Sequence, residues 1–320
     1  MNRQVVNDVL TFNSHTAYSY LLSKIGINFD VCPAWDYESR VLPNNFNLIT
    51  LKEAVENIRK GKYKTIITHE KKDLLLILKN INYIKDNKVN VIYTIHGRYH
   101  RGGIANKRHY RIAKFIFKEF LKSIVKLYDI SIVFITPCVK VSWNMDGFVI
   151  TPGQDIAEFE DSDFSINKLL VVGNNLHRHY FRFSLLNKIV KKFPIDIVGF
   201  NPKIPISKKA KNFEELIYSY KTHKAYLYLA NEPEEGFNLS LLEAMASGLP
   251  VITMYHPTSP IIHGYNGLVA FNEKEYMEYC EELLNNDSLA KVLGKNAKET
   301  IKTQFSIQEF ARKWKYVIER

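Results

Sequence analysis

The segment 234–252 reads EEGFNLSLLEAMASGLPVI; it follows the apolar run 224–230 and leads into a second one, 249–254. It begins with acidic residues, turns at Gly236, continues as a short apolar helix and stops at Gly248. A strand, a glycine turn, a helix and another strand in this order are typical of a parallel α/β sheet. The segment therefore predicts an α/β domain in the second half of the chain.

Strands and helices alternate in the same way along most of the 320 residues. An acidic loop at 158–163 separates two such series, so we place a first domain at 1–155 and a second at 156–305. The predicted fold class is α/β, with two doubly wound, Rossmann-like domains facing a cleft that holds the ligand. We expect strands at 63–69, 89–97, 130–137, 147–153, 168–175, 194–202, 224–230, 249–254 and 267–271, and helices at 105–128, 184–193, 213–223 and from 273 onward.

The charge of the chain is unevenly distributed. The net charge is +11, and residues 1–155, with 23 Lys and Arg against 13 Asp and Glu, carry +10 of it. The first domain should therefore attract an anionic partner. The three cysteines, Cys32, Cys138 and Cys280, form no CxxC pair, so neither a zinc site nor a disulfide framework is indicated. We expect a cytoplasmic protein, because the N-terminus is too polar for a signal peptide and no apolar run could span a membrane.

Two glutamates flank the start of the predicted helix in the opening segment. A helix that begins near Leu239 presents free N–H groups and the positive end of its dipole, which favour a phosphate. Glu235 would lie in the loop beside that phosphate, and Glu243 lies about one turn inside the helix. Carboxylates accept hydrogen bonds from hydroxyls, so the pair fits a diphosphate with a hydroxyl-bearing group at each end, as in a nucleotide sugar. The alternative is a solvated loop acid and a helix acid, but an unpaired charge in an apolar helix is costly.

The run EGFNLSLLEAMASGLPVI resembles the donor-binding motif of retaining GT-B glycosyltransferases, especially family four, in which seven residues lie between two glutamates (E-x7-E). Two more segments are similar to that family, HGYNGLVA at 263–270 and VITPGQDIAEF at 149–159. The C-terminal run QFSIQEFARKWKYVIE resembles the family's last helix, which implies that about 306–320 packs back on the first domain. The resemblance covers about 149–320 well and is weaker before it.

The resemblance implies a role for each matching residue. Glu235 would contact hydroxyls of the donor sugar, and Glu243 would bind the ribose. The backbone N–H groups of Phe237, Asn238 and Leu239 would bind the diphosphate. Asn238 stands where the family usually has glycine, and asparagine tolerates unusual backbone angles better than most residues.

The chain departs from the family after the first strand of the second domain, where the family has an arginine and a lysine that hold the diphosphate. The run GNNLHRHYFRF keeps Gly173 but has Asn174 in place of the arginine. Arg178 or Arg182 could supply the missing charge, and we favour Arg178. An arginine can bind phosphate through two N–H groups, so such a replacement is chemically sensible. The alternative is that the donor is held less tightly. The family's N-terminal Gly-Gly loop is also missing, so the acceptor side is not predicted in detail.

His96 ends the predicted strand 89–97. Family members often have a histidine there that touches the sugar, so we nominate His96, with Glu235 and Arg178, as a catalytic residue. The alternative is a strand-end histidine that only forms local hydrogen bonds.

The predicted helix 106–128 is amphipathic, and three interpretations of it stay open. It could be a core helix with a solvated basic face, an interfacial helix on anionic lipid, or a track for an anionic polymer acceptor. No aromatic-interleaved motif supports nucleic acid as the partner. The basic residues are Lys107, Arg111, Lys114, Lys118, Lys122 and Lys126, and the apolar ones are Ile112, Phe115, Ile116, Phe120, Ile124 and Leu127.

The sequence thus predicts a retaining glycosyltransferase, cytoplasmic or at the inner face of the membrane. The resemblance implies transfer of a sugar from a nucleoside-diphosphate sugar to an acceptor hydroxyl in glycan or glycolipid synthesis, with no cofactor, no metal and no established enzyme nucleophile. The acceptor is unknown and could be anionic or lipid-linked. Two alternatives stay open: a non-catalytic module that binds an anionic polymer or a membrane surface, and a sugar epimerase or phosphorylase of the same fold.

Overall fold

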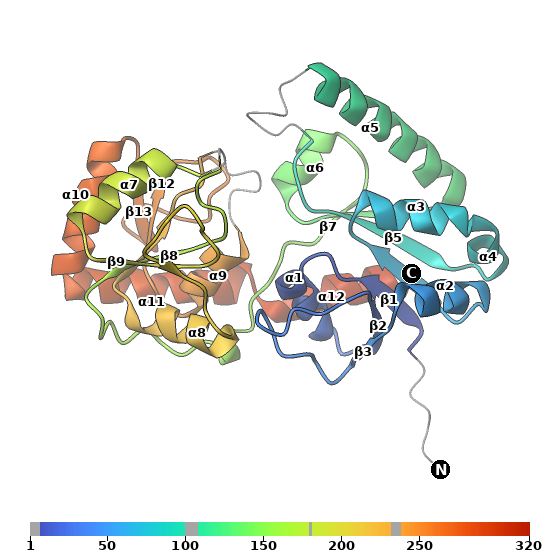
Figure 1. Ribbon diagram of the computed structural model, residues 1–320, viewed down its shortest axis with the longest axis horizontal. Helices are drawn as coiled ribbons and strands as arrows, with labels where there is room; N and C mark the ends of the chain where they lie inside the picture. Colours follow the sequence, from blue (N-terminus) through green and yellow to red (C-terminus); the bar gives the residue numbers. More distant parts are fainter. Residues whose placement is uncertain (1–6, 100–107, 179–180, 232–237) are drawn as a thin grey trace, which may run out of the picture. The chain divides into compact units, whose positions relative to one another are not determined.

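The computed structural model describes residues 7–99, 108–178, 181–231 and 238–320. The chain divides into two compact units (Figure 1). Residues Met1–Pro152 and Ile307–Arg320 form the first unit, and Gly153–Ser306 form the second. The sequence-based boundary at 155/156 lies just inside the second unit.

The first unit is built on a seven-stranded sheet with the order β3-β2-β1-β4-β5-β6-β7, in which every neighbouring pair is parallel. Its strands are β1 (Val9–Phe12), β2 (Phe29–Cys32), β3 (Phe46–Leu48), β4 (Thr65–Thr68), β5 (Asn90–Ile95), β6 (Ser131–Phe134) and β7 (Phe148–Val149). Its helices are α1 (Thr16–Ser23), α2 (Leu51–Arg59), α3 (Lys71–Lys79), α4 (Ile81–Asp86), α5 (Arg108–Tyr128), α6 (Pro137–Trp143) and α12 (Ile307–Ile318).

The second unit is built on a six-stranded parallel sheet with the order β10-β9-β8-β11-β12-β13. Its strands are β8 (Leu169–Val172), β9 (Ile195–Val198), β10 (Ser207–Lys208), β11 (Ala225–Tyr228), β12 (Val251–Met254) and β13 (Gly267–Ala270). Its helices are η2 (Ile156–Glu158), α7 (Phe183–Lys192), α8 (Phe213–Thr222), α9 (Leu239–Ala246), α10 (Glu273–Asn285) and α11 (Asp287–Gln304).

Once each sheet is numbered from its own first strand, the second has the same order as the first six strands of the first sheet, which adds β7 at its edge. In each, the first strand lies beside the fourth, and the chain winds outward in both directions from that pair. This is the doubly wound Rossmann arrangement, and its reversal of strand order is the switch point where ligands bind. The pairs at the switch points are β1 with β4 and β8 with β11. The two Rossmann-like α/β domains predicted from the sequence are therefore confirmed.

The chain end returns to the first unit as α12. Trp314 and Phe310 on this helix are buried, and its last carbonyls accept hydrogen bonds from the sheet. The amide Nδ2 of Asn90 donates to the Val317 carbonyl at 2.9 Å, and the Thr65 hydroxyl donates to the Ile318 carbonyl at 3.0 Å. These bonds fasten the helix to the starts of β5 and β4.

In the second unit, two helices approach so closely that only glycine fits between them. A Cβ added to Gly294 on α11 would lie 2.0 Å from the carbonyl oxygen of Gly248, which follows α9. The clash is with backbone, so it cannot be relieved by a side-chain movement. The contact fixes the position of α9, the helix that carries Glu243.

Gly294→Ala is expected to lower the free energy of unfolding by about 2 kcal/mol or more, because the added methyl overpacks this contact. In an unhindered helix the same change would instead raise stability by about 1 kcal/mol. Urea denaturation measures the free energy of unfolding of wild type and of Gly294→Ala. Lys295→Ala, on the exposed side of the same helix, is the control. A Gly294→Ala protein at least as stable as wild type would contradict the close approach.

Candidate functional site

The candidate donor site lies at the carboxyl edge of the second sheet, where β8 and β11 are neighbours. Parallel strands send the loops that follow them out at the same edge. The turn after β8 contains Gly173 and Asn174, and the loop after β11 leads into α9. The structure therefore brings two of the sequence-predicted segments to one switch point.

The turn after β8 is held by hydrogen bonds to the turn after β9. Asn174 accepts a hydrogen bond from the Phe200 backbone N–H at 2.7 Å, and the side-chain amide of Asn201 donates to the Gly173 carbonyl at 2.8 Å. Gly199 is required here, because its φ is +141° and a Cβ would lie 2.2 Å from the Gly173 oxygen. Asn174 stands in place of the family's arginine, and its side-chain oxygen forms one of the hydrogen bonds that hold the turn.

Arg182 is fixed at the end of β11. Its backbone N–H donates to the Leu229 carbonyl at 2.8 Å, and the preceding residue, Phe181, forms an isolated β-bridge with Ala230. The Nε of Arg182 is buried without a hydrogen-bond partner in the part of the chain that the structure describes. Arg178, favoured on the sequence, is exposed and its backbone N–H donates to the Asn175 carbonyl. Both arginines belong to the segment between β8 and α7.

Asn238 caps the start of α9. Its side-chain oxygen accepts hydrogen bonds from the Leu241 N–H and from the Ser240 hydroxyl, both at 2.9 Å. Its backbone is extended, with φ −126° and ψ 175°, so the unusual angles expected at this position do not occur. Leu239 is the first residue of the helix. Glu235 and Phe237 lie outside the residues that the structure describes, and their roles stay predictions.

Glu243 lies inside the core of the second unit, where it is 3% exposed. Its Oε2 accepts a hydrogen bond from the Tyr220 hydroxyl at 3.0 Å. The neighbouring Tyr226 hydroxyl forms a hydrogen bond of 2.9 Å with Ser240 on the same helix. The structure therefore assigns Glu243 a bond within the protein that the sequence analysis did not foresee, because Tyr220 lies on α8, outside the motif.

His96 follows β5 in the first unit, where it is half-buried and pairs with the buried His69. Nε2 of His96 lies 2.9 Å from Nδ1 of His69, whose Nε2 lies 3.1 Å from the Thr11 hydroxyl. The rings of Tyr18 and His96 pack edge to face, with centroids 4.6 Å apart. Thr11 lies on β1 and His69 follows β4, so the pair sits at the switch point of the first sheet.

Both imidazoles are neutral at pH 7. Burial lowers the pKa of His96 to about 3, and His15 nearby acts in the same direction. Burial also lowers the pKa of His69 well below its usual value, with a further contribution from His96. The pair can therefore exchange hydrogen bonds with a hydroxyl but supplies no positive charge. Sequence reasoning missed His69, although it ends its predicted strand, 63–69, as His96 ends the strand 89–97.

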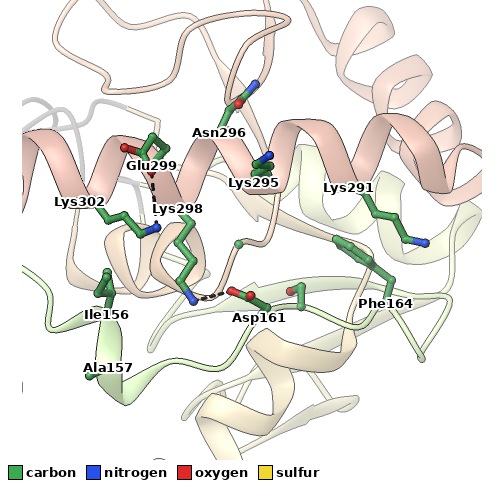
Figure 2. Close-up of a pocket in the computed structure, with 12 residues that line it drawn as sticks. Ile156, Ala157, Asp161, Phe164, Lys291, Lys295, Asn296, Lys298, Glu299 and Lys302 are labelled. Carbon is green, nitrogen blue, oxygen red and sulfur yellow. Dashed lines mark hydrogen bonds and ion pairs between the residues drawn. The ribbon is translucent and has the colours of Figure 1, made fainter.

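A separate cavity of about 800 Å³ opens on α11 (Figure 2). Lys298 crosses it to Asp161 at 2.5 Å, and Lys302 pairs with Glu299 at 3.5 Å. Gly248, beyond the C-terminal end of α9, also lines it. The cavity therefore lies at the opposite end of α9 from Asn238, and none of the sequence-predicted site residues lines it.

Two kinds of feature are absent from the described residues. No group of three or more histidine, cysteine, aspartate or glutamate side chains there could hold a metal ion. Among the helices in the described ranges, none is long and apolar enough to cross a membrane.

Residues 200–300 match the family model described as "Glycosyl transferases group 1". The matched region runs from the turn after β9 into α11 and includes α9. An uncharacterised glycosyltransferase of Methanocaldococcus jannaschii, MJ1178, is 30% identical over 156 residues, 48% of this chain and 40% of that protein. Poly(ribitol-phosphate) α-N-acetylglucosaminyltransferase of Staphylococcus aureus is 32% identical over 93 residues, 28% of this chain and 19% of that protein. The matches thus span less than half of either relative.

Solved structures resemble the chain over almost its full length. HepE of Anabaena, solved with UDP and glucose, has a TM-score of 0.72 at 12% identity and matches over 98% of this chain and 99% of its own. Sucrose-phosphate synthase of Thermosynechococcus elongatus has a TM-score of 0.70 at 14% identity, over 98% of each chain. Likeness at such low identity concerns the fold, and it confirms the predicted GT-B class.

The neutral histidine pair makes stability depend on pH. The unfolded chain binds protons at His69 and His96 below a pH of about 6.5, whereas the folded chain does not until the pH is much lower. The free energy of unfolding should therefore fall as the pH drops from about 6.5, by up to about 1.4 kcal/mol per pH unit for each histidine. Denaturation of wild type and His69→Gln/His96→Gln at several pH values measures this slope.

The double variant should lose most of the slope. Thr11→Val is the matched control, because it removes the hydroxyl beside His69 but keeps both histidines and should keep the slope. An unchanged slope in the double variant would show that the pair is not held neutral.

Proposed function

We propose that the protein transfers a sugar from a nucleoside-diphosphate sugar to a hydroxyl of an acceptor, with retention of the anomeric configuration. The second unit would bind the donor and the basic first unit the acceptor. A UDP-sugar is the first donor to test, because HepE was solved with UDP and glucose. The resemblance of the sequence to glycosyltransferase family four supports a role in glycan or glycolipid synthesis.

The observation that carries the proposal is the placement of α9. The helix begins at Asn238, at the carboxyl edge of a Rossmann sheet, and carries the buried carboxylate of Glu243 about one turn inside. This helix lies within the region that matches glycosyltransferases group 1. A phosphate at its N-terminus would meet the helix dipole, and a ribose beside it would meet a carboxylate that accepts hydrogen bonds from hydroxyls.

The diphosphate needs positive charge as well as backbone N–H groups. We propose that Arg182 supplies it, because its buried Nε has no hydrogen-bond partner within the described residues and its backbone is fixed beside β11. Arg178, on the exposed turn, is the second candidate. An arginine held in place stabilises negative charge that develops on the leaving diphosphate without having to reorganise during the reaction.

His96 would act on the sugar side. Because it is neutral, we propose that it forms a hydrogen bond with a sugar hydroxyl rather than stabilising a negative charge. His69 would fix the orientation of its ring through the 2.9 Å contact. Glu235, which precedes α9 in the sequence, would contact donor hydroxyls, as the resemblance implies.

The donor-binding role of Glu243 can be separated from its structural role. Glu243→Gln keeps an oxygen that can accept the Tyr220 hydrogen bond but removes the charge. Tyr220→Phe removes the same bond from the other side and keeps the carboxylate. We expect Glu243→Gln to weaken donor binding at least about tenfold, the size of a lost hydrogen bond to a charged group, and Tyr220→Phe to weaken it much less.

Thermal shifts with UDP-, GDP-, ADP- and TDP-sugars measure donor binding by wild type, Glu243→Gln and Tyr220→Phe. A donor at a hundredfold excess over its dissociation constant adds about 2.7 kcal/mol of stability to the wild type. Equal loss of binding in both variants would mean that Glu243 acts only on the structure. If no donor binds to wild type, and an anionic polymer binds with steep salt dependence instead, the protein is a binding module rather than a transferase.

Product analysis then separates the reaction types. A transferase moves the sugar to a new acceptor hydroxyl, and nuclear magnetic resonance of the product shows an unchanged anomeric configuration if the reaction is retaining. An epimerase or a phosphorylase would yield a rearranged donor or a sugar phosphate.

A further inference from the structure

Helix α5 carries a row of apolar side chains on its exposed side. Single exposed apolar residues are common on protein surfaces, but several on one helix mark an interaction site. Leu121 and Ile124 face inward and are buried. The exposed residues, named here the apolar stripe, are Ile112 (50% exposed), Phe115 (58%), Ile116 (61%), Phe120 (39%) and Leu127 (65%).

The spacing places the stripe along the length of the helix. Ile112, Ile116 and Phe120 follow one another at intervals of four, and Leu127 comes two turns later. At 1.5 Å per residue, the stripe extends for about 22 Å. Figure 1 shows α5 running along the outside of the first unit, beyond α3 and α6.

A basic edge accompanies the stripe. Arg111, Lys122 and Lys126 are exposed, and at 100° per residue they lie on the same side of the helix as Phe115. Glu119, the one acidic residue in the sequence of α5, is paired with Lys122 at 2.9 Å. The exposed side of α5 is therefore both apolar and positively charged.

Two other lysines turn toward the unit instead. Lys114 donates to the Arg98 carbonyl at 3.0 Å, and Lys118 lies 4.9 Å from the centre of the Tyr99 ring. These contacts depart from the first of the three interpretations of this helix, a core helix with a solvated basic face. Part of the apolar face is exposed, and part of the basic face packs on the protein.

We propose that α5 docks on a membrane surface that contains anionic lipid. The apolar stripe would enter the boundary of the acyl chains, and Arg111, Lys122 and Lys126 would contact the head groups. Nucleic acid would match the basic edge but leave the stripe exposed to water. A second copy of the chain would match the stripe but bring like charges together. A lipid surface complements both features.

The proposal is independent of the proposed function, and its test needs no sugar donor. The full-length protein is sedimented with vesicles of phosphatidylcholine alone and of phosphatidylcholine mixed with phosphatidylglycerol, at low and high salt. We expect binding to the mixed vesicles that weakens with salt, since exposed charges are screened.

Three variants locate the surface. Ile112→Ser/Ile116→Ser/Phe120→Ser should reduce partitioning to the mixed vesicles at least about tenfold, since three exposed apolar side chains are lost. Arg111→Gln/Lys122→Gln/Lys126→Gln should remove most of the preference for phosphatidylglycerol and most of the salt dependence. Val292→Ser, at a 57% exposed apolar position on α11, is the matched control and should bind as wild type does.

All three variants change exposed side chains, so their thermal stability should stay near that of wild type. The proposal is overturned if wild type does not bind the mixed vesicles at low salt, or if the apolar variant binds as well as wild type. It is also overturned if wild type ignores vesicles and the apolar variant instead dissociates an oligomer in size-exclusion chromatography. Donor binding by the same variants should be unchanged. A result that overturns the membrane proposal would therefore leave the proposed function standing.

Discussion

Parallel pairing of β8 with β11 is the interaction on which the proposed donor site depends. Leu169 lies beside Ala225 and Leu170 beside Tyr226, although more than fifty residues separate them in the chain. Because the two strands run in the same direction, the Gly173 turn and the start of α9 leave the sheet at one edge. The pairing of β1 with β4 does the same in the first unit, where it sets Thr11 beside His69. In each unit, residues far apart in the sequence become neighbours through strand order alone.

Glu243 is polar and buried and His96 is half-buried, and burial of polar groups is costly unless they are hydrogen-bonded. Glu243 is bonded to Tyr220, and His96 to His69. Each of these bonds fixes the position of a side chain before any ligand arrives, which is the condition for electrostatic stabilisation without reorganisation. Burial also sets the charge state, because it keeps the imidazole of His96 neutral. Fold stability and the proposed chemistry therefore rest on the same contacts.

The sequence allowed the domain type to be predicted, because alternating apolar strands and helices specify a parallel sheet. It did not reveal β1, β2 and β3, whose short runs VLTF, FDVC and FNL are too brief to show a period. The contact of Glu243 with Tyr220 joins two helices and leaves no signal in the motif. In α5, periodicity showed that the helix has two faces but not which of them is buried. Lysine stems can cover a protein surface as apolar side chains do, so Lys114 and Lys118 pack inward while Ile116 is exposed.

The central claim is that the carboxyl edge of the second sheet, at the pair β8 and β11, is a nucleotide-sugar site. The most direct test is a crystal structure of the protein soaked with UDP. We predict diphosphate density at the N-terminus of α9 with Arg182 beside it, and the ribose within hydrogen-bond distance of Glu243. Density in the lysine-lined cavity on α11, or no density in a crystal where the carboxyl edge is open to solvent, would contradict the account.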